Sequence, residues 1–211
     1  MNVLVLCGDR WHPAGVIREG LGALDNDGFS FDWIEDARNW SPDLMANYPV
    51  VVLAKSNNIS ENDHDGWVTS NVEAAFADCV RQGSGLLAIH SGTAEYEQKT
   101  VLRSLLGGVF DHHPEQCPVT VCPQAEHPLT AGCQPFTLED EHYFMTMDDP
   151  QTEVFLTTRS EHGEQPGGWR RTEGAGRVAV LTPGHNLEVL LHPTYQALLT
   201  NTLKWCGGES F

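Results

Sequence analysis

The sequence has few basic residues: 12 Lys and Arg stand against 29 Asp and Glu, which gives the 211-residue chain a formal net charge of −17. A protein that binds nucleic acid needs a basic face to neutralise phosphates, so we expect no nucleic-acid partner. The same acidity argues against docking on an anionic membrane surface, so we expect no membrane partner either. The chain is also rich in one titratable residue, because it contains ten histidines.

Long apolar runs are absent as well. No segment approaches the roughly 18 apolar residues that a membrane helix requires. The N-terminal segment has no basic region and only a short apolar stretch, so we expect no signal peptide. The six cysteines form no Cys-x-x-Cys pair, which favours reduced thiols that pack as small apolar side chains. Together these absences predict a cytoplasmic protein.

The first half of the chain alternates short apolar runs with amphipathic stretches. Continuous or alternating apolar runs predict strands at residues 2–6, 29–34, 49–54 and 86–89. Apolar residues at helical spacing predict helices at residues 14–24 and 67–81. This rhythm predicts an α/β fold whose parallel sheet has helices on both faces. No repeat or linker is visible, so residues 1–211 are predicted to form one domain.

The second half is less regular, and its strand-like pieces are separated by Pro and Asp turns. Strands are predicted at residues 119–122, 136–138, 143–147, 154–157 and 177–182, and a closing helix at 195–205. Residues 159–176 are polar and rich in Gly, which predicts a mobile loop around Trp169. We expect this indole to act as a lid over a binding site.

A histidine follows each of three predicted strands within a few residues. His12 comes after the first strand, His90 after the strand at 86–89 and His185 after the strand at 177–182. An open parallel sheet binds its ligands at the carboxyl ends of its strands, so these histidines are expected in one site. A shared site requires His90 and His185 to lie within about 10 Å of each other.

The segment Leu86-Leu87-Ala88-Ile89-His90-Ser91-Gly92-Thr93 runs from a strand into a turn of small residues, as a nucleophile elbow does. Such hydrolases place Ser or Cys at the tip within a G-x-S-x-G frame, which this chain lacks. His90 is therefore predicted to line a site without forming an acyl-enzyme, and Ser91 is a weaker candidate nucleophile. The alternative is that both side chains only satisfy backbone groups of the turn. No G-x-G-x-x-G follows the first strand, so a dinucleotide site is not expected.

Six short motifs, taken in order, resemble the ThuA-like (trehalose utilisation) family. They are Gly8-Asp9-Arg10-Trp11-His12-Pro13, Ala88-Ile89-His90-Ser91-Gly92-Thr93-Ala94, Gly107-Gly108-Val109-Phe110 before His112-His113, His127-Pro128-Leu129-Thr130, Asp140-Glu141-His142-Tyr143, and Gly176-Arg177-Val178 leading to Gly184-His185. The resemblance covers nearly the whole chain. It implies the class I glutamine amidotransferase-like fold, a flavodoxin-like three-layer sandwich with a mainly parallel central sheet, and a role in sugar utilisation.

The chain departs from the amidotransferases proper at two positions. Their elbow carries a catalytic Cys where this chain has His90, and their closing His-Pro-Glu resembles His192-Pro193-Thr194 with the acidic residue replaced. Without a thiolate nucleophile or the residue that orients the imidazole, glutamine hydrolysis by that route is not supported. The chain is thus not expected to be a glutamine amidotransferase.

Two further motifs supply candidate site residues through the resemblance. The family pattern Asp-Glu-x-Tyr selects Glu141 and Tyr143 as the residues that face the site, with Asp140 in a supporting position. The same pattern selects His113 from the pair His112-His113. His113 with His90, Glu141 and His185 would give a Zn²⁺ or other divalent metal site, and a metal-free acid/base site is as consistent with these residues.

The sequence therefore predicts an enzyme that acts on a small-molecule sugar, such as trehalose or a related glycoside or keto-sugar, by acid/base or metal-assisted chemistry. Hydrolysis, elimination and isomerisation all remain open. The predicted catalytic residues are His90, Glu141 and His185. The predicted substrate contacts are Asp9, Trp11, His12, Ser91, Tyr143 and Trp169. The alternatives are a non-catalytic sugar-binding or regulatory protein and an accessory subunit of a sugar oxidoreductase, and homo-oligomer formation is left open.

Overall fold

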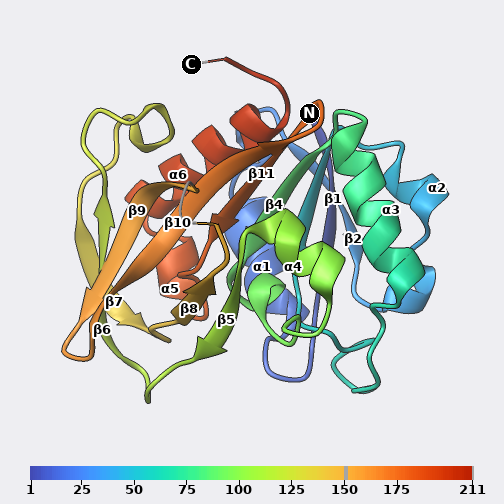
Figure 1. Cartoon of the computed structure of the whole chain (residues 1–211). Helices are drawn as coiled ribbons and strands as arrows, with labels where there is room; N and C mark the ends of the chain where they lie inside the picture. Colours follow the sequence, from blue (N-terminus) through green and yellow to red (C-terminus); the bar gives the residue numbers. More distant parts are fainter. Residues whose placement is uncertain (150–151, 211) are drawn as a thin grey trace.

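The computed structural model describes residues 1–149 and 152–210, and within them nine strands form one continuous sheet. These strands are β1 (Asn2–Cys7), β2 (Ser30–Ile34), β3 (Val50–Ala54), β4 (Gly85–Ile89), β6 (Cys117–Pro123), β7 (Phe136–Asp140), β9 (Glu153–Ser160), β10 (Gly163–Glu173) and β11 (Gly176–Leu181). Their order across the sheet is β2-β1-β3-β4-β11-β10-β9-β6-β7. The sheet therefore crosses the whole molecule (Figure 1).

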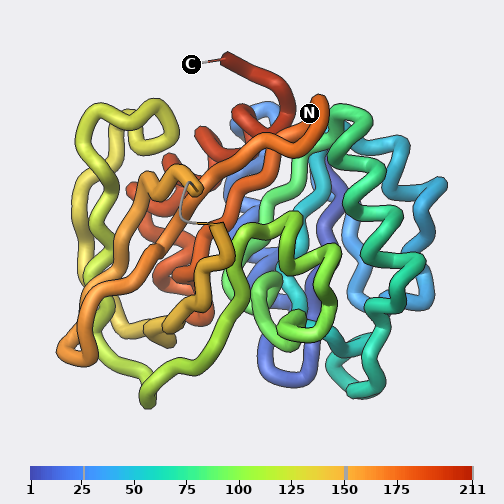
Figure 2. The backbone as a smooth tube through the Cα atoms, viewed as in Figure 1, coloured from blue at the N-terminus to red at the C-terminus, as the bar shows by residue number. Residues whose placement is uncertain are grey.

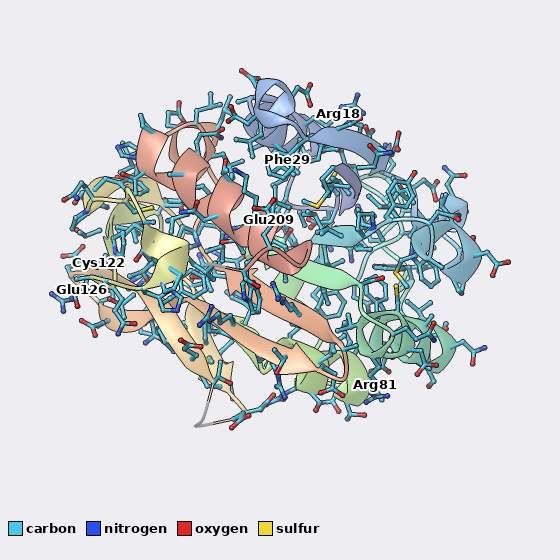
Figure 3. All side chains as sticks on the ribbon, turned by 90° about the horizontal axis from the view of Figure 1, so that it is seen from above. Arg18, Phe29, Arg81, Cys122, Glu126 and Glu209 are labelled. Atoms are coloured by element: carbon cyan, nitrogen blue, oxygen red, sulfur yellow. The ribbon has the colours of Figure 1, made fainter. Side chains whose placement is uncertain are left out.

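The half of the sheet from β2 to β11 is parallel. Its central strands are continuous apolar runs because helices cover both faces. The helices are α1 (Ala14–Gly22), α2 (Pro42–Met45), α3 (Ser70–Arg81), α4 (Thr100–Leu106), α5 (Leu187–Leu190) and α6 (Pro193–Cys206). One apolar core packs α1, α5 and α6 on one face of the sheet, and a second core packs α2, α3 and α4 on the other. Figure 3 looks down on the sheet between these two groups of helices.

The other half of the sheet is antiparallel, because β10 pairs with β11, β9 with β10, β6 with β9 and β7 with β6 in opposite directions. The α/β class predicted from the sequence is present, but the expected mainly parallel sheet is wrong in this half. The flavodoxin-like three-layer sandwich that the resemblance implies is therefore not confirmed, because the sheet is mixed. The start of β1 and the end of α6 lie at one end of the molecule, and the carboxyl ends of the parallel strands lie at the opposite end (Figure 2).

The mobile loop predicted at residues 159–176 is also wrong, because this segment contains the whole of β10. The strand pairs with β11 on one side and with β9 on the other. Its register with β9 shifts on both sides of Gly168, so the Gly-rich part of the segment forms an irregular stretch of strand. The Trp169 side chain is fully buried, and its indole N–H donates to the Leu106 carbonyl oxygen at 2.8 Å. Trp169 is thus part of the core beneath α4 and is not a lid.

A smaller sheet completes the fold near the carboxyl edge. It consists of β5 (Gly108–His112) and β8 (Phe144–Met147), which pair in antiparallel fashion. In the described part of the chain, four short 3-10 helices connect the larger elements: η1 (Asp25–Asp27), η2 (Ala37–Asn39), η3 (His90–Thr93) and η4 (Pro128–Thr130). Across residues 1–149 and 152–210, no helix has the length and apolarity needed to cross a membrane.

Candidate metal centre

Three histidines meet at the carboxyl edge of the parallel strands. His12 lies in the loop after β1, His90 begins η3 directly after β4, and His185 lies in the loop after β11. The ring centroids of His90 and His185 are 5.4 Å apart, and His12 lies 4.9 Å from His90 and 5.1 Å from His185. Because β1, β4 and β11 are close neighbours in the sheet, the expected convergence of the three strand ends occurs.

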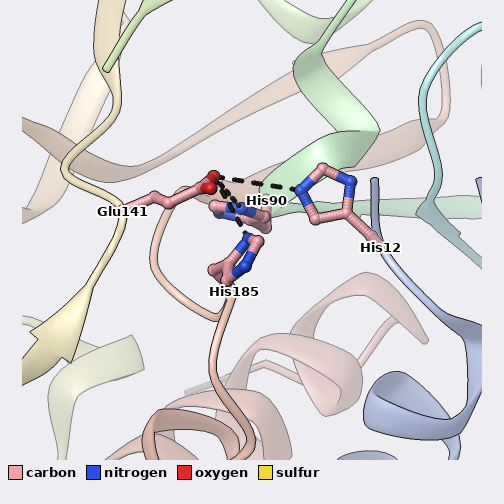
Figure 4. A group of neighbouring side chains, drawn as sticks. All are labelled: His12, His90, Glu141 and His185. Carbon is pink, nitrogen blue, oxygen red and sulfur yellow. Dashed lines mark ion pairs between the residues drawn. The ribbon is translucent and has the colours of Figure 1, made fainter. Parts of the chain in front are cut away.

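One oxygen of Glu141 faces all three imidazoles (Figure 4). Glu141 Oε2 lies 3.2 Å from His185 Nδ1, 3.3 Å from His90 Nε2 and 3.9 Å from His12 Nε2. All three nitrogens are buried, and none makes a hydrogen bond within the described part of the chain. Leaving a buried polar atom unsatisfied costs about 1–3 kcal/mol, so three at one point call for a physical explanation.

The outer nitrogens of two imidazoles are hydrogen-bonded, which assigns their tautomers. His90 Nδ1 lies 2.8 Å from the Thr182 carbonyl oxygen, which can only accept, so Nδ1 carries the hydrogen. His12 Nδ1 lies 2.8 Å from Asp9 Oδ1, and the pKa of Asp9 is held well below its usual range by His12 and by backbone N–H groups, against the opposing effect of burial. Nδ1 of His12 is therefore a donor as well. In the neutral imidazoles, both Nε2 atoms present lone pairs toward the Glu141 carboxylate.

The charges of the cluster follow from the same contacts. Burial lowers the pKa of His12, but Asp9 and Glu141 outweigh burial and raise this pKa to about 9. Burial lowers the pKa of His90 to about 4. Burial alone would raise the pKa of Glu141, yet the imidazoles hold it well below its usual range. A proton on His12 leaves Nε2 of neutral His90 without a partner, whereas a divalent cation would coordinate the facing nitrogens of all three imidazoles.

Two buried aspartates fix the loops that carry His12 and His185. Asp9 accepts hydrogen bonds from the backbone N–H of His12 and of Ser56, which joins the loops after β1 and β3. Asp140 accepts hydrogen bonds from the backbone N–H groups of Gly184, His185 and Asn186, which ties the end of β7 to the loop after β11. The predicted supporting position of Asp140 agrees with these contacts.

The backbone at His90 has an unusual conformation, and the turn that follows it packs tightly against β3. Its φ of 47° lies in the left-handed region, which is uncommon outside glycine and is found at functional sites. The turn that follows packs so closely on β3 that a Cβ at Gly92 would lie 1.9 Å from the Leu53 carbonyl oxygen. Only glycine fits at this position, and the tight turn holds the imidazole of His90 above the end of β4.

A cavity of about 410 Å³ opens beside the cluster, which is within the range of about 300–1,000 Å³ typical of small-molecule sites. Its lining residues are Trp11, His12, Ser56, Ala94, Glu95, Phe110, His113, Glu141, Tyr143 and His185. A second cavity of about 150 Å³ shares Trp11, His12 and His185 and also reaches His90 and Ser91. The Trp11 side chain is exposed and lies at both cavities.

The structure therefore brings together three of the predicted site residues, His90, Glu141 and His185. His12 was predicted to contact substrate, but its imidazole completes the group of four whose ligand atoms all lie within 4.8 Å of one another. His113, the metal ligand proposed from the sequence, is outside this group. It lies on the wall of the larger cavity, with its Nε2 3.6 Å from Glu141 Oε2.

The other predicted substrate contacts are distributed differently. Tyr143 lines the larger cavity and stacks on His90 at 3.9 Å, and Ser91 lines the smaller one. Asp9 is buried beneath His12 and lines neither cavity. Trp169 lies away from both, as described above. Glu95 also lines the larger cavity and was not predicted from the sequence. The one signal available for it was its position shortly after His90.

Comparisons with known proteins agree with this architecture. A ThuA-like protein from Parabacteroides merdae has 16% identity and a TM-score of 0.78, with 99% of this chain and 90% of that chain covered. A cytoplasmic protein from Salmonella typhimurium has 17% identity and a TM-score of 0.72, with 98% and 99% covered. A β-galactosidase from Rahnella has 14% identity and a TM-score of 0.66, with 95% of this chain but 31% of that chain covered.

These identities are low, so the three structures establish likeness of fold alone. No protein of curated function matches the chain. The family model ThuA, described as trehalose utilisation, matches residues 2–206, which include all four members of the His-Glu cluster. The chain therefore belongs to the ThuA family of trehalose utilisation.

Proposed function

We propose that this protein is a metal-dependent enzyme that acts on a sugar or keto-sugar in the larger cavity. The observation that carries the proposal is the set of three buried imidazole nitrogens that face one carboxylate oxygen without hydrogen bonds. The metal ligands would be His12, His90, Glu141 and His185. The proposed location is the cytoplasm, which is also the location named for the Salmonella neighbour.

The donor set and its surroundings fit a divalent ion. Three imidazoles and a carboxylate suit Zn²⁺ or another divalent first-row metal. Metal-bound histidines usually donate their second N–H to a carboxylate or a backbone carbonyl. His12 has the first kind of partner in Asp9, and His90 has the second kind in Thr182. Both imidazoles are thus oriented before any ion arrives.

When bound, such an ion would polarise a sugar carbonyl or hydroxyl oxygen or lower the pKa of a bound water. The protein's own groups would position the sugar. Trp11, Phe110 and Tyr143 provide aromatic surface for the apolar C–H face of a sugar ring. His113 Nδ1 donates to the Pro114 carbonyl oxygen at 2.7 Å, so Nε2, which lies 3.6 Å from Glu141 Oε2, is the nitrogen that would exchange a proton with the substrate. His113 is therefore proposed as an acid/base group and not as a ligand.

Metal analysis of the purified protein tests the proposal directly. Wild type is expected to bind about one divalent ion per chain. Glu141→Gln and His185→Ala are each expected to weaken metal binding at least tenfold, because each removes one ligand. His162→Ala changes an exposed histidine near Glu161 and is expected to bind metal as wild type does. Metal content is measured by plasma mass spectrometry and affinity by calorimetry.

Turnover separates the remaining alternatives. Metal-loaded wild type is expected to convert trehalose, a related glycoside or a 3-keto derivative, and the chelated protein is not. Absence of metal binding in wild type would leave only the metal-free acid/base site. Metal and sugar binding without turnover of any of these sugars would favour the non-catalytic sugar-binding protein or the accessory subunit.

A further inference from the structure

Glu95 is a second carboxylate in the larger cavity, and its backbone has an unusual conformation. Its φ is 64°, in the left-handed region that residues with side chains rarely adopt. The residues on both sides are buried, and the Tyr96 hydroxyl donates to the Lys55 carbonyl oxygen at 2.7 Å. The left-handed turn lets Ala94 and Tyr96 stay buried while Glu95 is exposed on the cavity wall. Strain of this kind persists where the surrounding structure enforces it, as it does at many binding sites.

A buried amide holds one oxygen of this carboxylate. Asn58 is 4% exposed, and its Nδ2 donates to Glu95 Oε2 at 3.0 Å. Asn58 Oδ1 accepts from the backbone N–H of Arg10 and from the Ser56 hydroxyl. One side chain thus joins the loops after β1, β3 and β4. Among the described residues, Glu95 Oε1 accepts no hydrogen bond, so the carboxylate is oriented and still has an acceptor to offer.

The charge of the cavity narrows the class of ligand. Its lining includes two carboxylates, Glu95 and Glu141, and contains neither Lys nor Arg. Lys55 is buried and donates to the carbonyl oxygens of Glu35 and Ile59 outside this lining. Arg10 lies over the Trp11 ring at 4.4 Å and does not line the cavity either. Phosphate groups of sugars are bound by Arg and Lys side chains, which this wall does not provide.

We propose that Glu95 is the sugar-binding carboxylate of the cavity, and that its Oε1 accepts hydrogen bonds from hydroxyl groups of an uncharged sugar. Its negative charge would also disfavour sugar phosphates. This inference rests on the proposed function, because it places the sugar beside the metal centre. The hydrogen bond from Asn58 orients the carboxylate and leaves Oε1 exposed on the cavity wall, where a sugar hydroxyl can replace water.

The test compares Glu95→Gln with Glu97→Gln, a matched change at an exposed residue outside this lining. The probes are trehalose, glucose and their 3-keto derivatives, with the 6-phosphate of whichever sugar binds most tightly. Calorimetry on zinc-loaded protein gives the Kd, and mass spectrometry gives the zinc content. Glu95→Gln is expected to weaken neutral-sugar binding at least tenfold at unchanged zinc content, and Glu97→Gln to match wild type. Wild type is expected to bind the 6-phosphate at least tenfold more weakly than the neutral sugar.

Glu95→Gly keeps the test independent of folding. Glycine adopts φ near 64° without strain, which offsets the lost hydrogen bond from Asn58, so this variant is expected to melt close to wild type while losing sugar affinity. The proposal is overturned if Glu95→Gln retains wild-type sugar affinity, if the 6-phosphate binds as tightly as the neutral sugar, or if zinc-loaded wild type binds none of these sugars. Failure of wild type to bind zinc would refute the metal centre alone, and sugar binding by the zinc-free variants would still decide the role of Glu95.

Discussion

At the scale of single residues, His12 and His90 have the same imidazole side chain but different pKa values, because their hydrogen-bond partners differ. Both are buried, but His12 has Asp9 beside its outer nitrogen, whereas His90 has only a neutral carbonyl. The negative partner raises the pKa of His12 to about 9, against the effect of burial, while burial lowers the pKa of His90 to about 4. Near neutral pH, in the absence of metal, His12 is therefore protonated and His90 is neutral.

This difference predicts how metal affinity depends on pH. A metal ion can bind His12 only after the proton on Nε2 leaves, so affinity is expected to rise roughly tenfold per pH unit from pH 7 toward 9. His90 is already neutral there and adds no dependence. Competition with a chelator between pH 6.5 and 8.5 measures the slope. His12→Gln is expected to flatten it and His162→Gln to preserve it, and a flat wild-type profile would contradict the assignment.

At the scale of secondary structure, the four proposed metal ligands come from both halves of the mixed sheet. The three histidines follow parallel strands, whereas Glu141 follows β7 in the antiparallel extension. The parallel half was predictable because buried parallel strands are continuous apolar runs that end in small or polar residues. β10 was not, because Arg170 pairs with Glu153 across strands and Gly168 lies against the Leu181 side chain. As a result, the sequence of β10 lacks the alternating or continuous apolar residues from which a strand is predicted.

The position of Trp169 in β10 gives a prediction at this scale. Trp169→Phe removes the hydrogen bond to the Leu106 carbonyl oxygen and leaves space in the core. We expect a loss of about 1–3 kcal/mol in the free energy of unfolding, from the unsatisfied carbonyl and the small cavity. Urea denaturation measures this loss, and sugar affinity is expected to stay unchanged. Unaltered stability together with weaker sugar binding would instead support the lid predicted from the sequence.

At the scale of the whole molecule, the fold class and the edge that holds the site follow from the sequence, but the full set of site residues does not. The strand-end pattern indicated His90 and His185, and family resemblance indicated Glu141. The same strand-end pattern applied to His12, yet its neighbour Trp11 suggested a stacking role instead. Glu95 depends on a left-handed turn and on a buried amide 37 positions earlier, and neither can be recognised in one sequence.

Metal binding is also expected to change global stability. An ion that binds only the folded state at about 100 times its Kd adds about 2.7 kcal/mol to the free energy of unfolding. For a chain of this length, that corresponds to a rise of roughly 5–10 °C in Tm. Calorimetric scans with and without a chelator measure the shift. Glu141→Gln is expected to show a smaller shift, and identical melting of chelated and loaded wild type would argue against the site.

The dispersal of the four proposed ligands along the chain has a consequence for biosynthesis. His12 leaves the ribosome before the other three side chains of the cluster, whereas His185 emerges only after β10 and β11 have been made. A nascent chain therefore offers a metal ion isolated side chains in place of a preformed site, and early capture of a wrong ion is disfavoured. On this basis, we expect the proposed site to select its metal only after β11 has been translated and the sheet has formed.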